Sequence, residues 1–298
     1  MACVLPLPYT RRLAAGDRKS PKRERNWLMT RNPDTAEGLA GQTMRATGFL
    51  SRLPVPARFW EDARAAAIGD DARTFPLAGV VIAAGPGLLL LILALIGMPT
   101  LMTAVFVILA LVAVTGALHE DGLGDVADGF GGGATKERRL EIMKDSRIGT
   151  YAAVAIAGSL MLRVAGLGAI IAAHGAWSAA ILLIAVSAVS RGAMVWFWAR
   201  LPNARGEGVA HAAGAPSEMA ANFAAIAGLA IFAVAGIAAA GFVNTAAALL
   251  FAIAATEAFS RLCRRMIGGI TGDTLGACQQ IAEIMLLAGL ALGISLPT

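Results

Sequence analysis

Three aspartates in one short stretch carry the clearest chemical signal in this chain. Asp121, Asp125 and Asp128 are spaced i, i+4 and i+7, which on a helix places them on one face. Carboxylates this close repel one another, and at the end of a membrane helix they need a cation to neutralise them. Mg²⁺ typically binds one or two carboxylates together with substrate phosphates. The spacing therefore predicts a Mg²⁺ site at these three aspartates.

Glycines and basic residues follow the aspartates directly. The run Gly131, Gly132 and Gly133 would end the helix and let the backbone approach a bulky anionic ligand. The next segment is basic and could hold phosphate oxygens, the arginines in bidentate fashion. Its candidate side chains are Arg138, Arg139, Lys144 and Arg147. His119 lies just before the aspartates, where we expect either a hydrogen-bonded residue at the end of a span or a general base.

Two further segments bring polar residues to the same side. Residues 268–283 contain Asp273 in a turn that leads into a helix, and Glu283 deeper in that helix. Glu283 is either functional or a partner for a buried arginine, Arg163 or Arg191, and the sequence leaves both readings open. Residues 190–208 add Arg191 and Arg205 as candidates for substrate binding. The aromatic run 196–198 in that segment is expected to anchor a helix at the headgroup level.

Composition indicates that membrane helices position these residues. The chain of 298 residues is 57% hydrophobic and 15% charged, against about 25% charged in soluble domains. No Asp, Glu, Lys or Arg occurs in residues 74–118, 164–190, 219–256 or 284–298. Each gap can hold one or two spans of about 20 residues. We therefore predict an all-α, polytopic integral membrane protein with about seven transmembrane helices, at 78–98, 101–118, 151–172, 178–198, 221–240, 243–260 and 278–296.

The basic residues predict the orientation of these helices. The loops 119–150, 199–219 and 261–276 carry Lys and Arg, whereas the turns near 99–100, 173–177 and 241–242 carry none. The positive-inside rule places the basic loops, and with them the active site and the N-terminus, in the cytoplasm. Residues 1–40 hold eight Lys or Arg against four Asp or Glu and read as a disordered basic extension that touches lipid headgroups. Residues 41–298 then form one membrane catalytic domain, and no nucleic-acid role is expected.

Six sequence blocks in this chain resemble the cobalamin synthase family. They are FLSRLPVP (49–56), FPLAGVV (75–81), HEDGLGDVADG (119–129), RRLEIMKDSRIGTY (138–151), SRGAM with ARLPNARGEG (190–208) and GGITGDTLGA (268–277). The resemblance covers residues 44–290 and leaves the N-terminal extension outside. Two positions depart from the family pattern, because Glu120 stands where an apolar residue is usual and Gly124 where Ala is common. Glu120 could add a metal ligand or face water.

The resemblance implies the last assembly step of the cobalamin nucleotide loop, in a Mg²⁺-dependent enzyme of the bacterial inner membrane. Its substrates would be adenosylcobinamide-GDP and α-ribazole or α-ribazole 5′-phosphate, and its products adenosylcobalamin or its 5′-phosphate, and GMP. Metal at the three aspartates would bridge the diphosphate, and Arg138, Arg139 and Arg147 would stabilise the leaving GMP. Asp145, or else His119, would be the general base. A homo-oligomer, or association with other cobalamin-assembly enzymes, stays open.

Two other classes share parts of these features. Residues 125–129 match the opening of the CDP-alcohol phosphatidyltransferase signature, but Gly132 and Gly133 replace the Ala-Arg pair expected next, and the later aspartates of that signature are missing. A secondary transporter could use Arg163, Glu257 and Glu283 as a translocation path. A transporter has no need of three aspartates beside a basic, glycine-led segment, and no repeated half is evident. Both alternatives therefore rank below the cobalamin synthase reading.

Overall fold

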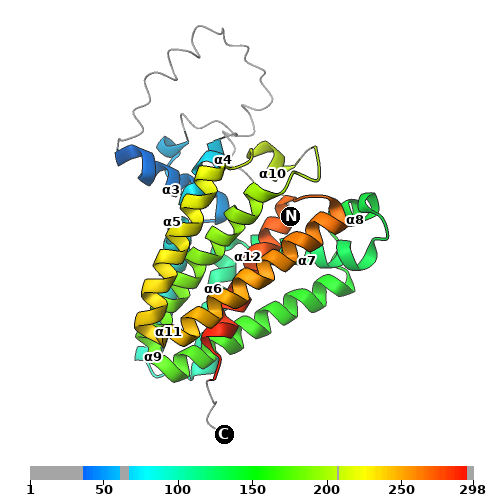
Figure 1. Ribbon diagram of the computed structural model, residues 1–298. Coiled ribbons are helices and arrows are strands. Elements are labelled where there is room, and N and C mark those ends of the chain that lie inside the picture. Colours follow the sequence, from blue (N-terminus) through cyan, green and yellow to red (C-terminus); the bar gives the residue numbers. More distant parts are fainter. Residues whose placement is uncertain (1–35, 61–66, 207, 294–298) are drawn as a thin grey trace.

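The computed structural model describes residues 36–60, 67–206 and 208–293 (Figure 1). These residues form helices joined by short turns, and an isolated parallel bridge links Asn203 to Ile270. The elements are α3 (Ala36–Leu50), η1 (Ala57–Phe59), α4 (Ala67–Asp71), η2 (Ala72–Thr74), α5 (Phe75–Leu95), α6 (Thr100–Thr115), α7 (Leu118–Gly132), α8 (Lys136–Ile142), α9 (Thr150–Arg200), α10 (Val209–Ala212), α11 (Glu218–Ile267) and α12 (Gly272–Leu290). The predicted all-α class is confirmed for the described ranges. Most of the predicted basic extension lies outside them, and α3 begins at Ala36.

Three helical runs are long and apolar enough to cross a membrane. They are Ile68–Leu95, Thr150–Arg200 and Glu218–Ile267. The pair formed by α6 and α7 satisfies the same criterion only when the two helices are joined, so the described residues offer three such runs, or four with this pair. These runs support a membrane protein, but they are fewer than the seven spans predicted. Part of the difference is that α9 and α11 each count as one run, although a non-helical glycine divides each of them.

Glycines break both long helices near the predicted turns. Gly175 in α9 has φ 76° and ψ 169°, and Gly241 in α11 has φ 82° and ψ 167°. Positive φ at these angles is accessible to glycine at little cost, so each helix can change direction there. Figure 1 shows the midpoints of α9 and α11 together at one end of the molecule, with α4, α8 and α10 towards the other. The residues predicted to do chemistry lie at this second end.

A sharp bend separates α7, the helix that carries Asp121, Asp125 and Asp128, from α6. These aspartates were predicted at the end of a membrane helix, but α7 does not continue the direction of α6. The two helices make an angle of 87°. Gly116 (φ 64°) and Ala117 (φ 58°) adopt left-handed backbone conformations at the bend, and Ala117 is the one non-glycine residue with positive φ among the described residues. A Cβ on Gly116 would also meet the Arg52 side chain. The bend turns α7 across the helix ends, where it reaches α12.

A buried polar network joins α7, α9 and α12 beneath the site. The Arg163 guanidinium donates to Glu283 Oε1 at 2.8 Å and to Glu120 Oε1 at 2.7 Å. Gln280 donates to Glu120, and Gln279 donates to Glu283. Arg163, Glu120 and Glu283 are each less than 5% exposed. Glu283 was predicted to be either functional or the partner of a buried arginine, and the structure shows it paired with Arg163. Glu120 also contacts this arginine and does not face water.

Candidate active site

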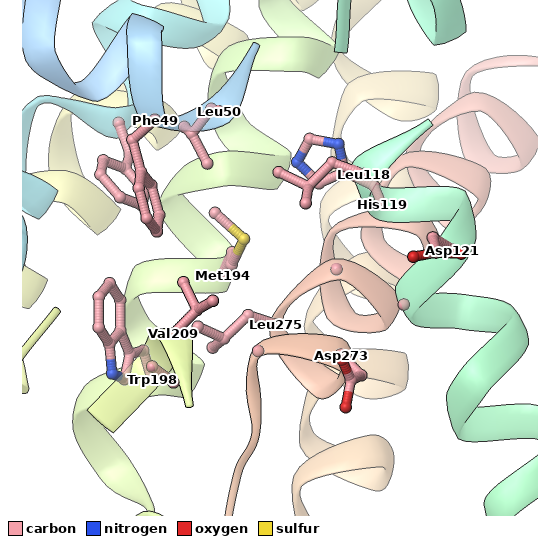
Figure 2. Close-up of a pocket in the computed structure, with 15 residues that line it drawn as sticks. Phe49, Leu50, Leu118, His119, Asp121, Met194, Trp198, Val209, Asp273 and Leu275 are labelled. Atoms are coloured by element: carbon pink, nitrogen blue, oxygen red, sulfur yellow. The ribbon is translucent and has the colours of Figure 1, made fainter. Parts of the chain in front are cut away.

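A cavity of about 180 Å³ opens where α7 and the first turn of α12 face α3 and the end of α9. Figure 2 shows Asp121 and Asp273 on one side of this cavity, with Phe49 and Trp198 on the other and His119 at its top. The cavity therefore has an acidic side and an aromatic side. That combination suits a ligand with a charged or hydroxyl-bearing end and a flat apolar end.

Two glycines bring the acidic residues together. A Cβ on Gly122 would lie 2.6 Å from the Asp273 carbonyl oxygen, and one on Gly276 would lie 3.2 Å from the His119 Cα. The backbones of α7 and α12 thus touch where any larger side chain would force them apart. Asp121 and Asp273 line the same cavity because these backbone contacts hold α7 against α12.

The carboxylates influence one another electrostatically. Asp125 lies one helical turn after Asp121, on α7, outside the three long apolar runs. Burial, followed by the nearby negative charges of Asp273 and Asp121, raises the pKa of Asp125 to about 7. A cation that enters the cluster would favour the ionised form of the Asp125 carboxyl group. The structure thus places Asp121, Asp125 and Asp273 within electrostatic reach of one another.

Asp128 makes contacts of a different kind. Its Oδ2 accepts a hydrogen bond from the Gly149 amide at 2.6 Å, and its Oδ1 accepts one from the Ala152 amide at 2.9 Å. These amides belong to the first turn of α9, so Asp128 caps that helix. In the described part of the chain, no group of three or more His, Cys, Asp or Glu side chains is arranged to hold a metal ion on its own. The predicted three-aspartate cluster is therefore not preformed.

Two of the predicted phosphate-binding arginines face the protein interior beside the site. Arg205 donates to Asp273 Oδ2 at 3.2 Å and to the Leu140 carbonyl at 3.1 Å. Backbone hydrogen bonds on both sides of the Asn203–Ile270 bridge tie the Arg205 loop to the start of α12. Arg139 donates to the carbonyls of Met266 and Ala134. Arg205 thus contacts the acidic side of the cavity directly.

Arg138, Lys144 and Arg147 lie on exposed surface. Arg147 and Asp145 form an exposed pair through several hydrogen bonds, and those bonds lower the pKa of Asp145 to about 2. Arg138 pairs with Glu141 in the same helix, also at the surface, and Lys144 is exposed. None of these side chains lines the cavity. Asp145 is therefore tied to Arg147 at the surface and lies outside the cavity.

The predicted glycine run packs against protein side chains. A Cβ on Gly131 would meet the Tyr151 ring at 2.8 Å, and one on Gly133 would meet Arg139 at 2.5 Å. Gly131 and Gly132 are exposed and lie outside the cavity. The run therefore allows α7 to end closely against α8 and the start of α9.

His119 and Arg191 are buried close to the cavity. His119 is 2% exposed, and its Nε2 has no hydrogen-bond partner. Burial and the charges of Arg191 and Arg163 lower the pKa of His119 well below its usual range, so the imidazole is neutral. Arg191 donates to both oxygens of Ser187 and does not line the cavity, whereas His119 does.

Sequence reasoning missed the aromatic side of the cavity. The aromatic run at 196–198 was expected at the lipid headgroups, but Phe197 is fully buried and Trp198 is 2% exposed, so that expectation is wrong for both. Trp198 packs on Phe75, and Phe75 packs on Phe49, across three segments that are distant in sequence. No local period reveals such a contact. A usable signal existed, because two of the family-like blocks begin at Phe49 and Phe75.

The chain is similar to proteins of one family along most of its length. Residues 42–291 match the family described as cobalamin-5-phosphate synthase. Adenosylcobinamide-GDP ribazoletransferase of Brucella anthropi is 46% identical over 261 residues, which cover 86% of this chain and 98% of that protein. The proteins of the same name from Sinorhizobium medicae and Brucella ovis are 45% and 46% identical, over 84% and 86% of this chain and 95% and 98% of their own. No solved structure matches.

These matches cover the whole candidate site, from the end of α3 to α12. They favour the resemblance seen in the six blocks over the phosphatidyltransferase and transporter alternatives. The chain belongs to the cobalamin-5-phosphate synthase family and is an enzyme with adenosylcobinamide-GDP ribazoletransferase activity.

Proposed function

We propose that ribazole transfer takes place in the cavity between α7 and α12. The ribose 3′-hydroxyl oxygen of α-ribazole would form a bond to the phosphorus next to cobinamide. The bond from that phosphorus to the GMP oxygen would break, and the hydroxyl would lose its proton. The observation that carries this proposal is that Asp121 and Asp273 line one cavity through the close contact of Gly122 and Gly276. Phosphoryl transfer depends mainly on positioning and electrostatic stabilisation, which fixed charges provide.

Mg²⁺ fits the acidic side of this cavity. The raised pKa of Asp125 reflects its burial and the charges of Asp273 and Asp121, and a cation would offset that repulsion. Mg²⁺ commonly takes one or two carboxylates and fills its other positions with water and substrate phosphates, so it does not need a preformed set of three. Asp121 and Asp273 would hold the ion, with Asp125 beside them and Asp128 further away as a helix cap. When bound, Mg²⁺ would polarise the diphosphate and neutralise developing charge.

Two side chains near the acidic residues would assist the reacting groups. Arg205 borders Asp273 and, being bidentate and always charged, would bind the diphosphate oxygens of adenosylcobinamide-GDP. His119 lines the cavity with an unpartnered Nε2, so it would accept the ribose hydroxyl proton. We prefer His119 to Asp145 for this role because Asp145 is tied to Arg147 on exposed surface. Arg138, Arg139 and Arg147 then have no assigned contact with the leaving GMP.

We further propose that the chain crosses the bacterial inner membrane seven times, with the active site in the cytoplasm. The crossing segments would be α5, α6, the two halves of α9, the two halves of α11, and α12. The breaks at Gly175 and Gly241, and the basic residues at the opposite end, support this arrangement. A reporter fused near Ala134 should be cytoplasmic. A periplasmic reporter would reject the orientation while leaving the site itself unaffected.

The activity is tested by measuring GMP released from adenosylcobinamide-GDP in purified membranes. Release should require α-ribazole or its 5′-phosphate, and it should stop when Mg²⁺ is removed with EDTA and return when Mg²⁺ is added. Running the two ribazole forms in parallel decides which is preferred. Membranes from the same host without the protein are the control. Release that continues without any ribazole would indicate hydrolysis instead of transfer.

A further inference from the structure

Three aromatic rings form a continuous wall on one side of the active-site cavity. Phe49 lies at the end of α3, Phe75 at the start of α5 and Trp198 near the end of α9. The ring centroids of Phe49 and Phe75 are 6.1 Å apart, and those of Phe75 and Trp198 are 6.2 Å apart. We call these three residues the aromatic wall. Met194 lies beside it and also lines the cavity.

The wall faces polar groups across the cavity. Figure 2 shows Phe49 and Trp198 opposite Asp121 and Asp273, with His119 between the two sides at the top. His119 is nine-tenths buried and its Nε2 lacks a hydrogen-bond partner, which is costly unless a ligand supplies one. Phe75 is fully buried and Trp198 is 2% exposed, so the wall meets the cavity mainly through the half-buried Phe49 and a small part of Trp198. The same cavity is lined by His119 and the two carboxylates.

We infer that the aromatic wall binds the benzimidazole base of α-ribazole, with the ribose directed towards His119 and Asp121. This inference rests on the proposed function, because it names where one substrate lies in that site. In this pose the benzimidazole base packs against the aromatic rings, and the His119 Nε2 forms a hydrogen bond with the ribose. The base would fix the ribose 3′-hydroxyl on the acidic side of the cavity.

Among the substrate groups, the benzimidazole base matches the chemistry of the aromatic wall best. The dimethylbenzimidazole base is flat, carries two methyl groups and has a single free ring nitrogen, so it loses little when placed against apolar rings. Guanine has donors and acceptors along its edge that would be buried without partners there. The corrin ring carries amide side chains and is far broader than the wall. The wall residues and Met194 offer thioether and ring carbons, which match the benzimidazole.

The test compares two tryptophans that lie two residues apart in α9. Trp198→Leu removes the wall residue, whereas Trp196→Leu changes a ring that stacks under Arg200, 4.1 Å from it, and does not line the cavity. Base–aromatic stacking by one residue corresponds to about a tenfold change in affinity. We expect Trp198→Leu to raise the KM for α-ribazole about tenfold and to leave the KM for adenosylcobinamide-GDP within about twofold. Trp196→Leu should leave both constants unchanged.

Two further measurements keep the test decisive. Equilibrium dialysis of α-ribazole against detergent-purified protein, without the second substrate, should show the same loss of binding for Trp198→Leu. If that variant does not insert, Phe49→Leu changes a half-buried wall residue and should show the same selective effect. An equal rise in both KM values, or an unchanged KM for α-ribazole in folded protein, would overturn the inference. Wild-type protein that releases no GMP would contradict the proposed function instead, so the two failures are distinct.

Discussion

Gly122 of α7 lies directly against the backbone of Asp273 at the start of α12, so closely that a Cβ on this glycine would stand 2.6 Å from the Asp273 carbonyl oxygen. This contact fixes the separation of Asp121 and Asp273, which lie on the same cavity. The acidic side of the active site therefore depends on the absence of one side chain.

Replacing Gly122 by alanine should disturb the site more than the membrane fold. The methyl group would push α7 away from α12 at a cost of about 1–3 kcal/mol. A displacement of the carboxylates by about 1 Å can reduce turnover about 100-fold. Gly158→Ala is the matched control, because no atom lies within 4 Å of the added Cβ in α9. Turnover per inserted molecule is the measurement, and equal activity of both variants would show that the contact does not position the site.

Asp128→Asn should affect stability more than chemistry. Asp128 caps α9 through the Gly149 and Ala152 amides, and losing such a cap costs about 1 kcal/mol. The asparagine retains one acceptor oxygen, so we expect a slightly lower melting temperature and turnover within about fivefold of wild type. Thermal unfolding in detergent, measured beside GMP release, checks this. Complete loss of activity in a stable Asp128→Asn protein would restore Asp128 as a metal ligand.

Glu283→Gln should lower stability because it breaks the buried pair with Arg163. Removing one partner of such a pair costs about 3 kcal/mol, and the remaining bond from Arg163 to Glu120 should reduce that cost. Glu257→Gln is the control, since Glu257 pairs with Arg261 at the surface. Surface pairs contribute about 0–1 kcal/mol, so this change should have little effect. Stability is read from thermal unfolding, and equal loss in both variants would contradict a structural role for the network.

Asp145→Asn should leave turnover within about threefold of wild type, because its partner is the exposed Arg147 and it does not line the cavity. His119→Gln should reduce kcat at least about 100-fold, since glutamine cannot accept the ribose proton. Steady-state kinetics of the two variants at saturating substrates compare the two candidate bases. A large loss in Asp145→Asn with normal insertion would mean that the 143–149 loop reaches the cavity during turnover.

The sequence predicted the apolar helices well, because uncharged stretches mark them without knowledge of packing. It also placed Asp273 correctly at the start of the last helix and identified Arg163 as one possible partner for Glu283. The turns predicted near 173–177 and 241–242 coincide with the non-helical Gly175 and Gly241, whereas helix length and composition give three or four apolar runs in the described residues instead of seven.

Local sequence patterns do not reveal contacts between distant segments. Helical spacing puts Asp128 on the face of Asp121 and Asp125, but it does not show that the start of α9 lies there to be capped. At the bend, Gly116 is a typical left-handed glycine at a helix end, but the positive φ of Ala117 goes against local preference, since alanine normally avoids it. Trp198 was placed at the lipid surface because its neighbours in sequence are aromatic. Its neighbours in space are Phe75 and the cavity.

The rate of GMP release by purified Asp121→Asn and Asp273→Asn proteins tests the assigned active site most directly. Both substitutions keep the size of the side chain and remove one negative charge from the cavity. We expect each to reduce release at least about 100-fold while the melting temperature in detergent stays within about 3 °C of wild type. Near-normal release by either variant, at equal insertion and with saturating Mg²⁺, would contradict the assignment of the active site to the junction of α7 and α12.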